Sequence, residues 1–266
     1  TAAGFGATVG FIRANVDNGA NGQGRIDVAN LATEVRLGTS VFDASAEASN
    51  VIARFSTNAA SATGAQKITT GSGNDVVIFD NQNDNRAGLT ISDTVDGGTG
   101  SDTLVIDGHL AAAGTIALGA SEWTNVSNFE TIQLAGANGG ATSYKLTLTD
   151  TLIAKNNANG VLAIVNDNDG KNNVSLAAGG VDTNPDGTSQ ESAVTIDAHF
   201  LNNTSRFSYK GEEGGTKTAD RIIMSDVNLN GSHTINGGAA DYNGATFVGN
   251  GDTLEIRNNA VATLGD

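Results

Sequence analysis

Short runs of β-forming residues, separated by clusters of Gly, Asn, Asp, Ser and Thr, constrain this chain more than any other feature of its sequence. Aliphatic and β-branched residues favour strands, whereas Gly, Asn and Asp favour tight turns. The runs cover residues 76–79, 103–106, 131–134, 144–148, 161–165, 194–196, 221–224 and 253–256. Helical periodicity is weak, and its best candidates are the short segments 29–36 and 44–55. The pattern predicts an all-β protein, either a solenoid or a sandwich.

The charged residues favour a divalent cation as a partner. The chain has 29 acidic and 14 basic residues, a formal net charge of −15, and 21 of the acids are Asp. Asp suits tight turns and the coordination of hard cations better than Glu does. So negative a chain would repel nucleic acid and anionic lipid. No stretch approaches the roughly 20 apolar residues of a membrane span, so membrane insertion is not expected.

The chain has no cysteine, and this favours bound calcium as a stabilising element. Without cysteine the chain forms neither disulfides nor thiolate metal sites. A large extracellular chain of this kind needs another brace, and bound calcium can provide one. The sequence begins at Thr1 with neither Met nor a signal-peptide pattern, and we interpret it as a piece of a longer protein.

Two nonapeptides combine glycine turns with a final Asp. GGTGSDTLV at 97–105 matches the GGxGxDxUx repeat of calcium-binding β-rolls in full, and TGSGNDVVI at 70–78 lacks only its first glycine. Glycine permits a positive φ, so the turn can aim carbonyl oxygens inward, and Asp adds a carboxylate. Calcium takes about 6–8 oxygen ligands, which stacked turns of this kind would supply together.

The spacing of Asp residues allows two interpretations. Asp75, Asp84, Asp93 and Asp102 lie nine residues apart, as four continuous repeats would require. We prefer two stacked turns, ending at Asp75 and Asp102, with residues 80–93 forming a loop between them.

A second region repeats this order of motifs. Asp102-Thr103-Leu104 matches Asp252-Thr253-Leu254, and Asp75 matches Asp220. We interpret residues 67–106 and 207–256 as two copies of one unit with inserted loops. The predicted organisation is an N-terminal β segment at 1–66, a first calcium-repeat block at 67–160 and a second, degenerate block at 161–266.

Other motifs give no sign of catalysis. The three histidines are isolated, and neither HExxH nor GxSxG occurs, so we do not expect an enzyme. The Asp167–Gly170 tetrapeptide lacks the downstream Glu of a helix-flanked calcium loop and is interpreted as a surface turn. Scattered aromatic residues are interpreted as core in preference to a carbohydrate platform; they are Trp123, Phe129, Phe200, Phe207, Tyr209 and Phe247.

Several motifs together resemble a known family. GSGNDVVIF at 71–79, GGTGSDTLVI at 97–106 and VSNFETIQL at 126–134 resemble repeats-in-toxin (RTX, hemolysin-type) calcium-binding proteins, in particular the surface-layer proteins and giant adhesins that Gram-negative bacteria export by type I secretion. In that family a calcium turn, a spacer, a second calcium turn and a Phe-Glu-Thr strand recur in this order. The TLTDTLI run ending at residue 153 is similar to the segment after that strand in many of the adhesins.

The resemblance covers residues 67–155 well and 207–256 loosely, and it implies secretion and calcium-dependent folding outside the cell. By position it makes carboxylates and turn carbonyls the calcium ligands. The implied ligands are Gly71, Gly73, Asp75, Gly97, Thr99, Gly100 and Asp102, with Asp220 and Asp252 in the second block.

The predicted fold is therefore an elongated all-β protein, partly a parallel β-roll or solenoid, with calcium-binding glycine turns and β-sandwich-like insertions. The leading functional hypothesis is a structural cell-surface protein that assembles with copies of itself into a surface layer, with cell-surface polysaccharide as a further candidate partner. One alternative is a spacer or ligand-binding module of a large adhesin. Another is the non-catalytic secretion domain of an exported hydrolase.

Overall fold

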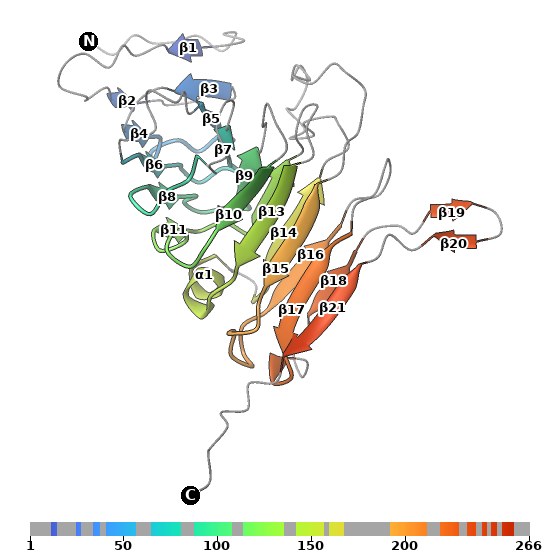
Figure 1. Cartoon of the computed structure of the whole chain (residues 1–266). Helices are drawn as coiled ribbons and strands as arrows, with labels where there is room; N and C mark the ends of the chain where they lie inside the picture. The colour runs from blue at the N-terminus through green and yellow to red at the C-terminus, as the bar shows by residue number, and fades with distance from the viewer. Residues whose placement is uncertain are drawn as a thin grey trace, which may run out of the picture.

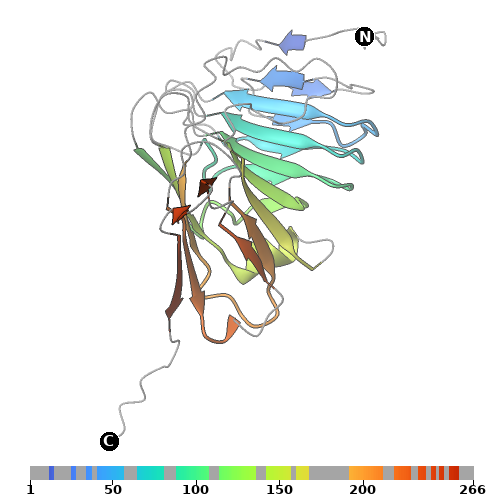
Figure 2. The ribbon, with the colours of Figure 1, turned by 90° about the vertical axis from the view of Figure 1, so that its right-hand side faces the viewer.

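The computed structural model is a parallel β-solenoid in which successive rungs stack from the N-terminal to the C-terminal end (Figure 1, Figure 2). The structure describes residues 12–14, 25–27, 34–37, 41–56, 65–80, 88–107, 114–135, 142–156, 160–167, 192–211, 219–228, 233–237, 241–243, 246–248 and 252–257. The all-β, solenoidal prediction is confirmed.

One nine-stranded sheet, sheet A, runs the length of the solenoid. Its strands in spatial order are β1 (Ile12–Ala14), β3 (Glu34–Leu37), β5 (Ile52–Ser56), β7 (Val76–Asp80), β9 (Thr103–Asp107), β12 (Thr131–Ala135), β14 (Leu162–Asp167), β16 (Phe207–Lys210) and β18 (Thr234–Asn236). Sheet A passes through all three predicted segments, 1–66, 67–160 and 161–266, and the division into those segments stays a prediction.

Two five-stranded parallel sheets close the solenoid against sheet A. Sheet B contains β2 (Arg25–Asp27), β4 (Val41–Asp43), β6 (Lys67–Thr69), β8 (Thr94–Asp96) and β11 (Val126–Ser127). Sheet C contains β10 (Gly114–Leu118), β13 (Thr142–Thr147), β15 (Ala193–Asp197), β17 (Arg221–Ser225) and β21 (Thr253–Arg257). The N-terminal rungs therefore alternate sheets B and A, the C-terminal rungs alternate A and C, and the rungs of β8 and β11 use all three.

The only antiparallel pair among the described strands is formed by β19 (Asp241–Asn243) and β20 (Thr246–Val248). Figure 1 shows this hairpin projecting away from the stack, on the side of the molecule where sheet C ends. The hairpin precedes β21 in the sequence, and β21 still pairs directly with β17 in sheet C.

A short helix ends sheet B. Helix α1 (Asp150–Lys155) follows β13 and lies beyond β11, where a further strand of sheet B would otherwise stand (Figure 1). The Thr149 hydroxyl caps the helix by accepting the Leu152 amide at 3.1 Å. After the helix, Asn156 accepts the Phe129 amide at 3.1 Å and donates to the carbonyls of Val126 and Leu152. These bonds satisfy backbone groups that an open sheet edge would leave unpaired.

The core lies between the sheets and is lined by alternate residues of each strand. Phe55 contacts Phe42 edge to face at 6.1 Å and stacks on Phe79 at 5.8 Å, so aromatic rings from successive rungs form one column. The interpretation of the scattered aromatics as core is confirmed for Trp123, Phe129, Phe207 and Tyr209. Phe200 is instead 69% exposed, and the side chain of Phe247 lies outside the described residues.

All eight predicted β runs correspond to strands, with bounds that differ by no more than two residues. The helical candidate at 44–55 is wrong, because these residues form a turn that leads into β5. In the candidate at 29–36, the described residues from Glu34 onward form β3. In the segment 44–55, Val51, Ala53 and Phe55 are buried at every second residue, and this burial outweighs a weak helical propensity.

Candidate functional site

The two predicted glycine turns lie at the corner where the chain passes from sheet B to sheet A. Val76 lies opposite Thr103 and Lys67 opposite Thr94, so consecutive rungs are 27 residues apart. Turn 70–75 therefore lies directly against turn 97–102. This register supports our preferred interpretation of two stacked turns that end at Asp75 and Asp102, and residues 88–93, the described part of the predicted loop, form no strand. Asp84 itself lies outside the described residues.

Glycine is required here because the two turns approach each other backbone to backbone. A Cβ added to Gly98 would lie 2.0 Å from the Gly71 carbonyl oxygen, and one added to Gly100 would lie 2.0 Å from that of Gly73. Gly98 and Gly100 also have positive φ, +83° and +141° respectively. The Thr99 amide donates to the Gly71 carbonyl at 2.9 Å. The predicted ligand carbonyl of Gly71 thus also serves to join the two rungs.

The acidic residues of this corner form a ladder in which each carboxylate joins its rung to the previous one. Asp75 accepts the Val51 amide at 2.7 Å through Oδ1, and Asp102 accepts the Asp75 amide at 2.7 Å through Oδ1. Glu130 continues the ladder by accepting the Asp102 amide at 2.7 Å. Each carboxylate replaces a backbone acceptor at a corner, where the pairing of the sheets is interrupted.

Asp75 and Asp102 differ in their second carboxylate oxygen. The Gly71 amide donates to Asp75 Oδ2 at 3.1 Å. The corresponding Gly98 amide is 27 residues later and donates instead to Asp96 Oδ1 at 3.0 Å. Asp102 Oδ2 is buried, and without that amide it has no hydrogen-bond partner. A buried, unpaired carboxylate oxygen is costly, so this atom is the most conspicuous polar defect of the corner.

The charges around Asp102 increase that cost. Burial raises the pKa of the Asp102 carboxyl from 3.8 to about 7; the negative charges of Asp75, Glu130 and Asp96 add to the effect, and the Asp75 amide opposes it. Burial also raises the pKa of the Asp75 carboxyl, although its bonds to two amides oppose the shift. A proton or a bound cation would relieve the charge on Asp102.

The rung below the second turn is shorter and leaves a cavity. Asp96 pairs with Ser127 and Thr103 with Thr131, so residues 97–102 lie above the three residues 128–130. The resulting cavity has a volume of about 300 Å³ and is lined by Gly98, Thr99, Gly100, Asn128, Glu130, Ala154 and Lys155. No described residue donates to the Gly98 carbonyl, whereas its counterpart at Gly71 accepts the Thr99 amide. The cavity thus adjoins both a free turn carbonyl and an acidic residue.

The second predicted block forms a similar ladder at a different corner, the one entering sheet C. Asp220 accepts the Val194 amide at 2.9 Å and the Tyr209 hydroxyl at 2.5 Å, and its own amide donates to Asp252 at 2.9 Å. Burial raises the pKa of Asp220 to about 6, against the effect of the Tyr209 hydrogen bond. The matching Asp residues of the two blocks therefore make the same kind of hydrogen bond between rungs. They do so before different sheets, since Asp102 precedes a strand of sheet A and Asp252 precedes a strand of sheet C.

The structure brings the predicted ligands together in two groups: seven at the first corner, and Asp220 with Asp252 at the second. Among the described residues, no three His, Cys, Asp or Glu side chains form a group arranged to hold a metal ion. Sequence reasoning missed Glu130, Asn156 and Tyr209. The Phe-Glu-Thr motif, 28 residues after Asp102, was the available signal for Glu130.

Comparisons with known proteins identify no relative: no family model, no curated protein and no solved structure matches this chain. No described helix is long and apolar enough to cross a membrane.

Proposed function

We propose that this chain is a calcium-stabilised structural segment of a bacterial cell-surface protein that assembles with copies of itself into a surface layer. Its location outside the cell and its bacterial origin rest on the RTX-like motifs. The observation that carries the calcium proposal is the buried, unpartnered Asp102 Oδ2, with three other acidic residues near it. Calcium prefers carboxylate and carbonyl oxygens, and the adjoining cavity is lined by Glu130 and by Gly98, whose carbonyl accepts no hydrogen bond from a described residue.

The proposed site would hold calcium through Asp102, with Glu130 and the turn carbonyls of residues 98–100 as further donors. Asp75 contributes less, because both of its oxygens already accept amide hydrogens. Extracellular calcium modules often bind at about 10⁻⁴–10⁻³ M. Millimolar calcium would then stabilise the fold by on the order of 1–2 kcal/mol per site, because the ion binds only the folded state.

Calorimetric titration tests the site. The matched variants are Asp102→Asn and Asp226→Asn, since Asp226 is exposed and lies outside both ladders. We expect the first variant to bind one calcium ion fewer than the parent, and the second to bind as the parent does. Unchanged binding in Asp102→Asn, or an identical melting temperature of the parent in calcium and in chelator, would overturn the proposal.

The negative charge should make self-assembly depend on calcium, because bound calcium ions would offset charge that otherwise keeps the copies apart. Copies that each carry −15 repel one another, and salt screens this repulsion only beyond roughly 8–10 Å. Light scattering and electron microscopy across a calcium titration should show larger assemblies as calcium rises. Magnesium should substitute poorly because it demands stricter octahedral geometry. A calcium-loaded protein that stays monomeric would favour the adhesin module instead.

A further inference from the structure

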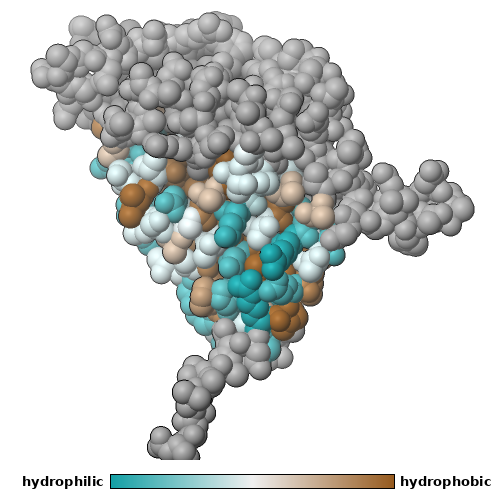
Figure 3. Space-filling model, in the orientation of Figure 1, coloured by the Kyte–Doolittle hydropathy of each residue, from teal (hydrophilic) through white to brown (hydrophobic). Residues whose placement is uncertain are grey.

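The last strand of sheet C exposes apolar side chains that belong to the core face. Leu254 and Ile256 of β21 pair with Ile222 and Met224 of β17, and so they point to the same side of the sheet. Ile222 and Met224 are 4% and 1% exposed, whereas Leu254 and Ile256 are 52% and 43% exposed. Figure 3 shows hydrophobic surface near the end of the solenoid where the C-terminal strands lie. The core face is therefore incompletely covered at β21.

The backbone of β21 also has an open edge. The Thr253 amide donates to Asp220 and the Arg257 carbonyl accepts from Asp226, so both residues turn their peptide groups toward β17. In a parallel pair, alternate residues bond to opposite neighbours. The peptide groups of Leu254 and Ile256 consequently point away from β17, and no described strand pairs with them. Such an edge accepts another strand readily.

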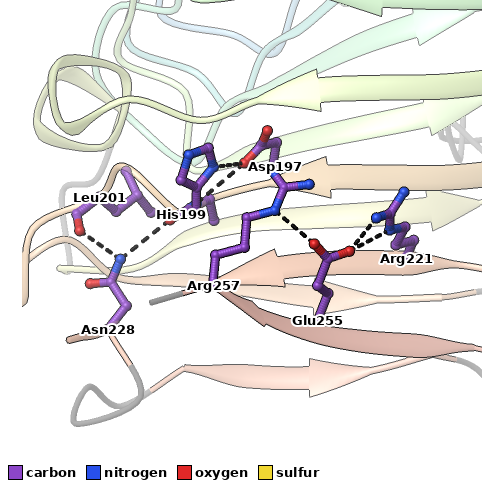
Figure 4. Close-up of polar contacts among 8 residues, drawn as sticks. Asp197, His199, Leu201, Arg221, Asn228, Glu255 and Arg257 are labelled. Atoms are coloured by element: carbon purple, nitrogen blue, oxygen red, sulfur yellow. Dashed lines mark hydrogen bonds and ion pairs between the residues drawn. The ribbon is translucent and has the colours of Figure 1, made fainter. Parts of the chain in front are cut away.

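The charged side chains on the other face of β21 are self-complementary. Glu255 accepts from Arg257 Nε at 2.7 Å and from the guanidinium of Arg221, and Figure 4 shows it between the two. Their order along the strand is acid, Ile256, base. Antiparallel pairing of two such strands with Ile256 opposite Ile256 places each Glu255 opposite the other copy's Arg257. Pairing centred on Glu255 would instead oppose like charges.

We propose that two copies of this chain associate by antiparallel pairing of their β21 strands, with Ile256 at the two-fold axis. Outward-facing peptide groups at Ile256 allow a reciprocal pair of backbone hydrogen bonds in this register, and the exposed apolar side chains meet across the axis. This contact specifies how the proposed self-association would occur and rests on that proposal, but it involves none of the residues of the proposed calcium site.

Head-to-tail continuation of sheet C would be a different contact. It would join β21 of one copy to β10 of the next, because β10 is the other edge strand of sheet C. The inward-facing Ile116 and Leu118 of β10 are already fully buried, so that edge offers no uncovered core face. A two-fold contact instead uses one open edge twice, as isologous dimers do.

The experiment measures association of the parent and of edge variants by sedimentation velocity in calcium. A contact built on one strand is small, so we expect reversible dimers with a dissociation constant in the micromolar range. Ile256→Asp should raise that constant at least tenfold. Phe200→Asp, which changes a more exposed apolar side chain away from β21, should not change it. Melting curves confirm that each variant is folded.

Charge-reversal variants test the proposed register more specifically than Ile256→Asp does. Glu255→Arg alone and Arg257→Glu alone each oppose like charges across the axis and should dimerise at least tenfold more weakly. An equimolar mixture of the two variants restores opposite charges and should form the mixed dimer at close to parental affinity. If the mixture associates no better than either variant alone, the β21 contact is wrong.

The outcomes separate this inference from the proposed function. Calcium-dependent assembly that persists in all edge variants refutes the β21 contact and leaves the proposed function standing. Dimers that depend on β21 but are indifferent to calcium support the contact and refute calcium-dependent assembly. A parent that remains monomeric throughout refutes both.

Discussion

Replacing Asp102 by Asn should change the stability of the protein in opposite directions at low and high pH. The folded pKa of Asp102 is about 7 and its ordinary value is 3.8, a rise of about 3. At 1.36 kcal/mol per unit this amounts to a penalty of about 4 kcal/mol for ionising the residue in the folded state. Because the folded pKa is raised, the penalty is absent below about pH 4, grows between pH 4 and 7, and is complete above that range.

The Asn variant removes the charge but keeps an oxygen that can accept the Asp75 amide. Its amide NH₂ would occupy the position of Oδ2, where a buried donor without a partner costs about 1–3 kcal/mol. In chelator we therefore expect Asp102→Asn to be more stable than the parent by about 1–3 kcal/mol at pH 8. At pH 4.5 only about 1 kcal/mol of the ionisation penalty has developed, so the variant should be less stable than the parent by up to about 2 kcal/mol. Calcium should stabilise the parent at pH 8 and leave the variant unchanged.

Urea unfolding followed by circular dichroism, at both pH values and with calcium or chelator, measures these free energies. The Asp226→Asn variant controls for a general change of net charge. A loss of stability of equal size at pH 4.5 and pH 8 would refute the reasoning, because it would mean that Asp102 is not held at a raised pKa. Stabilisation of Asp102→Asn by calcium would refute the assignment of the ion to this residue.

Three further substitutions test the packing and the hydrogen bonds. Gly98→Ala should lower the free energy of unfolding by about 2–4 kcal/mol, because the added Cβ would lie 2.0 Å from a backbone oxygen at a position of positive φ. Gly160→Ala is the control: its φ is also positive, at +87°, but nothing lies within 4 Å, so urea unfolding should show a loss of only about 1 kcal/mol. Tyr209→Phe should raise the pKa of Asp220 further by removing a bond to its ionised form, so the loss of about 1–3 kcal/mol should be larger at pH 8 than at pH 4.5. Asn156→Asp should lower the free energy of unfolding by about 2–3 kcal/mol, because it removes both side-chain donors. Amide hydrogen exchange in β11 should also become faster, and an unchanged exchange rate would contradict a capping role.

The strands could be predicted from the sequence because local composition determines them. Runs such as 103–106 and 253–256 are rich in β-branched and aliphatic residues and end at turn-forming residues, and each became a strand. The stacking of turns 70–75 and 97–102 also followed from their motifs. The three-sheet arrangement could not be predicted, because the path of the chain after β9 depends on long-range packing of Ile116 and Leu118 that no local pattern encodes.

Helix α1 was missed for a physical reason. It has only six residues, too few to show a 3.6-residue period, and its stability comes from the Thr149 cap and from Leu152 and Ile153 buried against the end of sheet B. A capping Thr followed by Asp was the only local signal. The role of Asn156 was equally hidden, since its partners Phe129 and Val126 lie on the previous rung.

The glycine turns show why a motif does not fix the number of ion sites. Within a stack, a turn carbonyl such as that of Gly71 accepts an amide of the next rung, and the Asp closing the turn accepts two amides, as Asp75 does. After the second turn the next rung is shorter and the carbonyl of Gly98 remains free, and Asp102 keeps an unused oxygen because the Gly98 amide donates to Asp96 instead. Oxygens for a cation thus become available where a run of stacked turns ends. We therefore propose one calcium site at this corner although the sequence contains two motifs. A longer run of the same motifs would add stacking bonds between rungs without adding proposed sites in proportion.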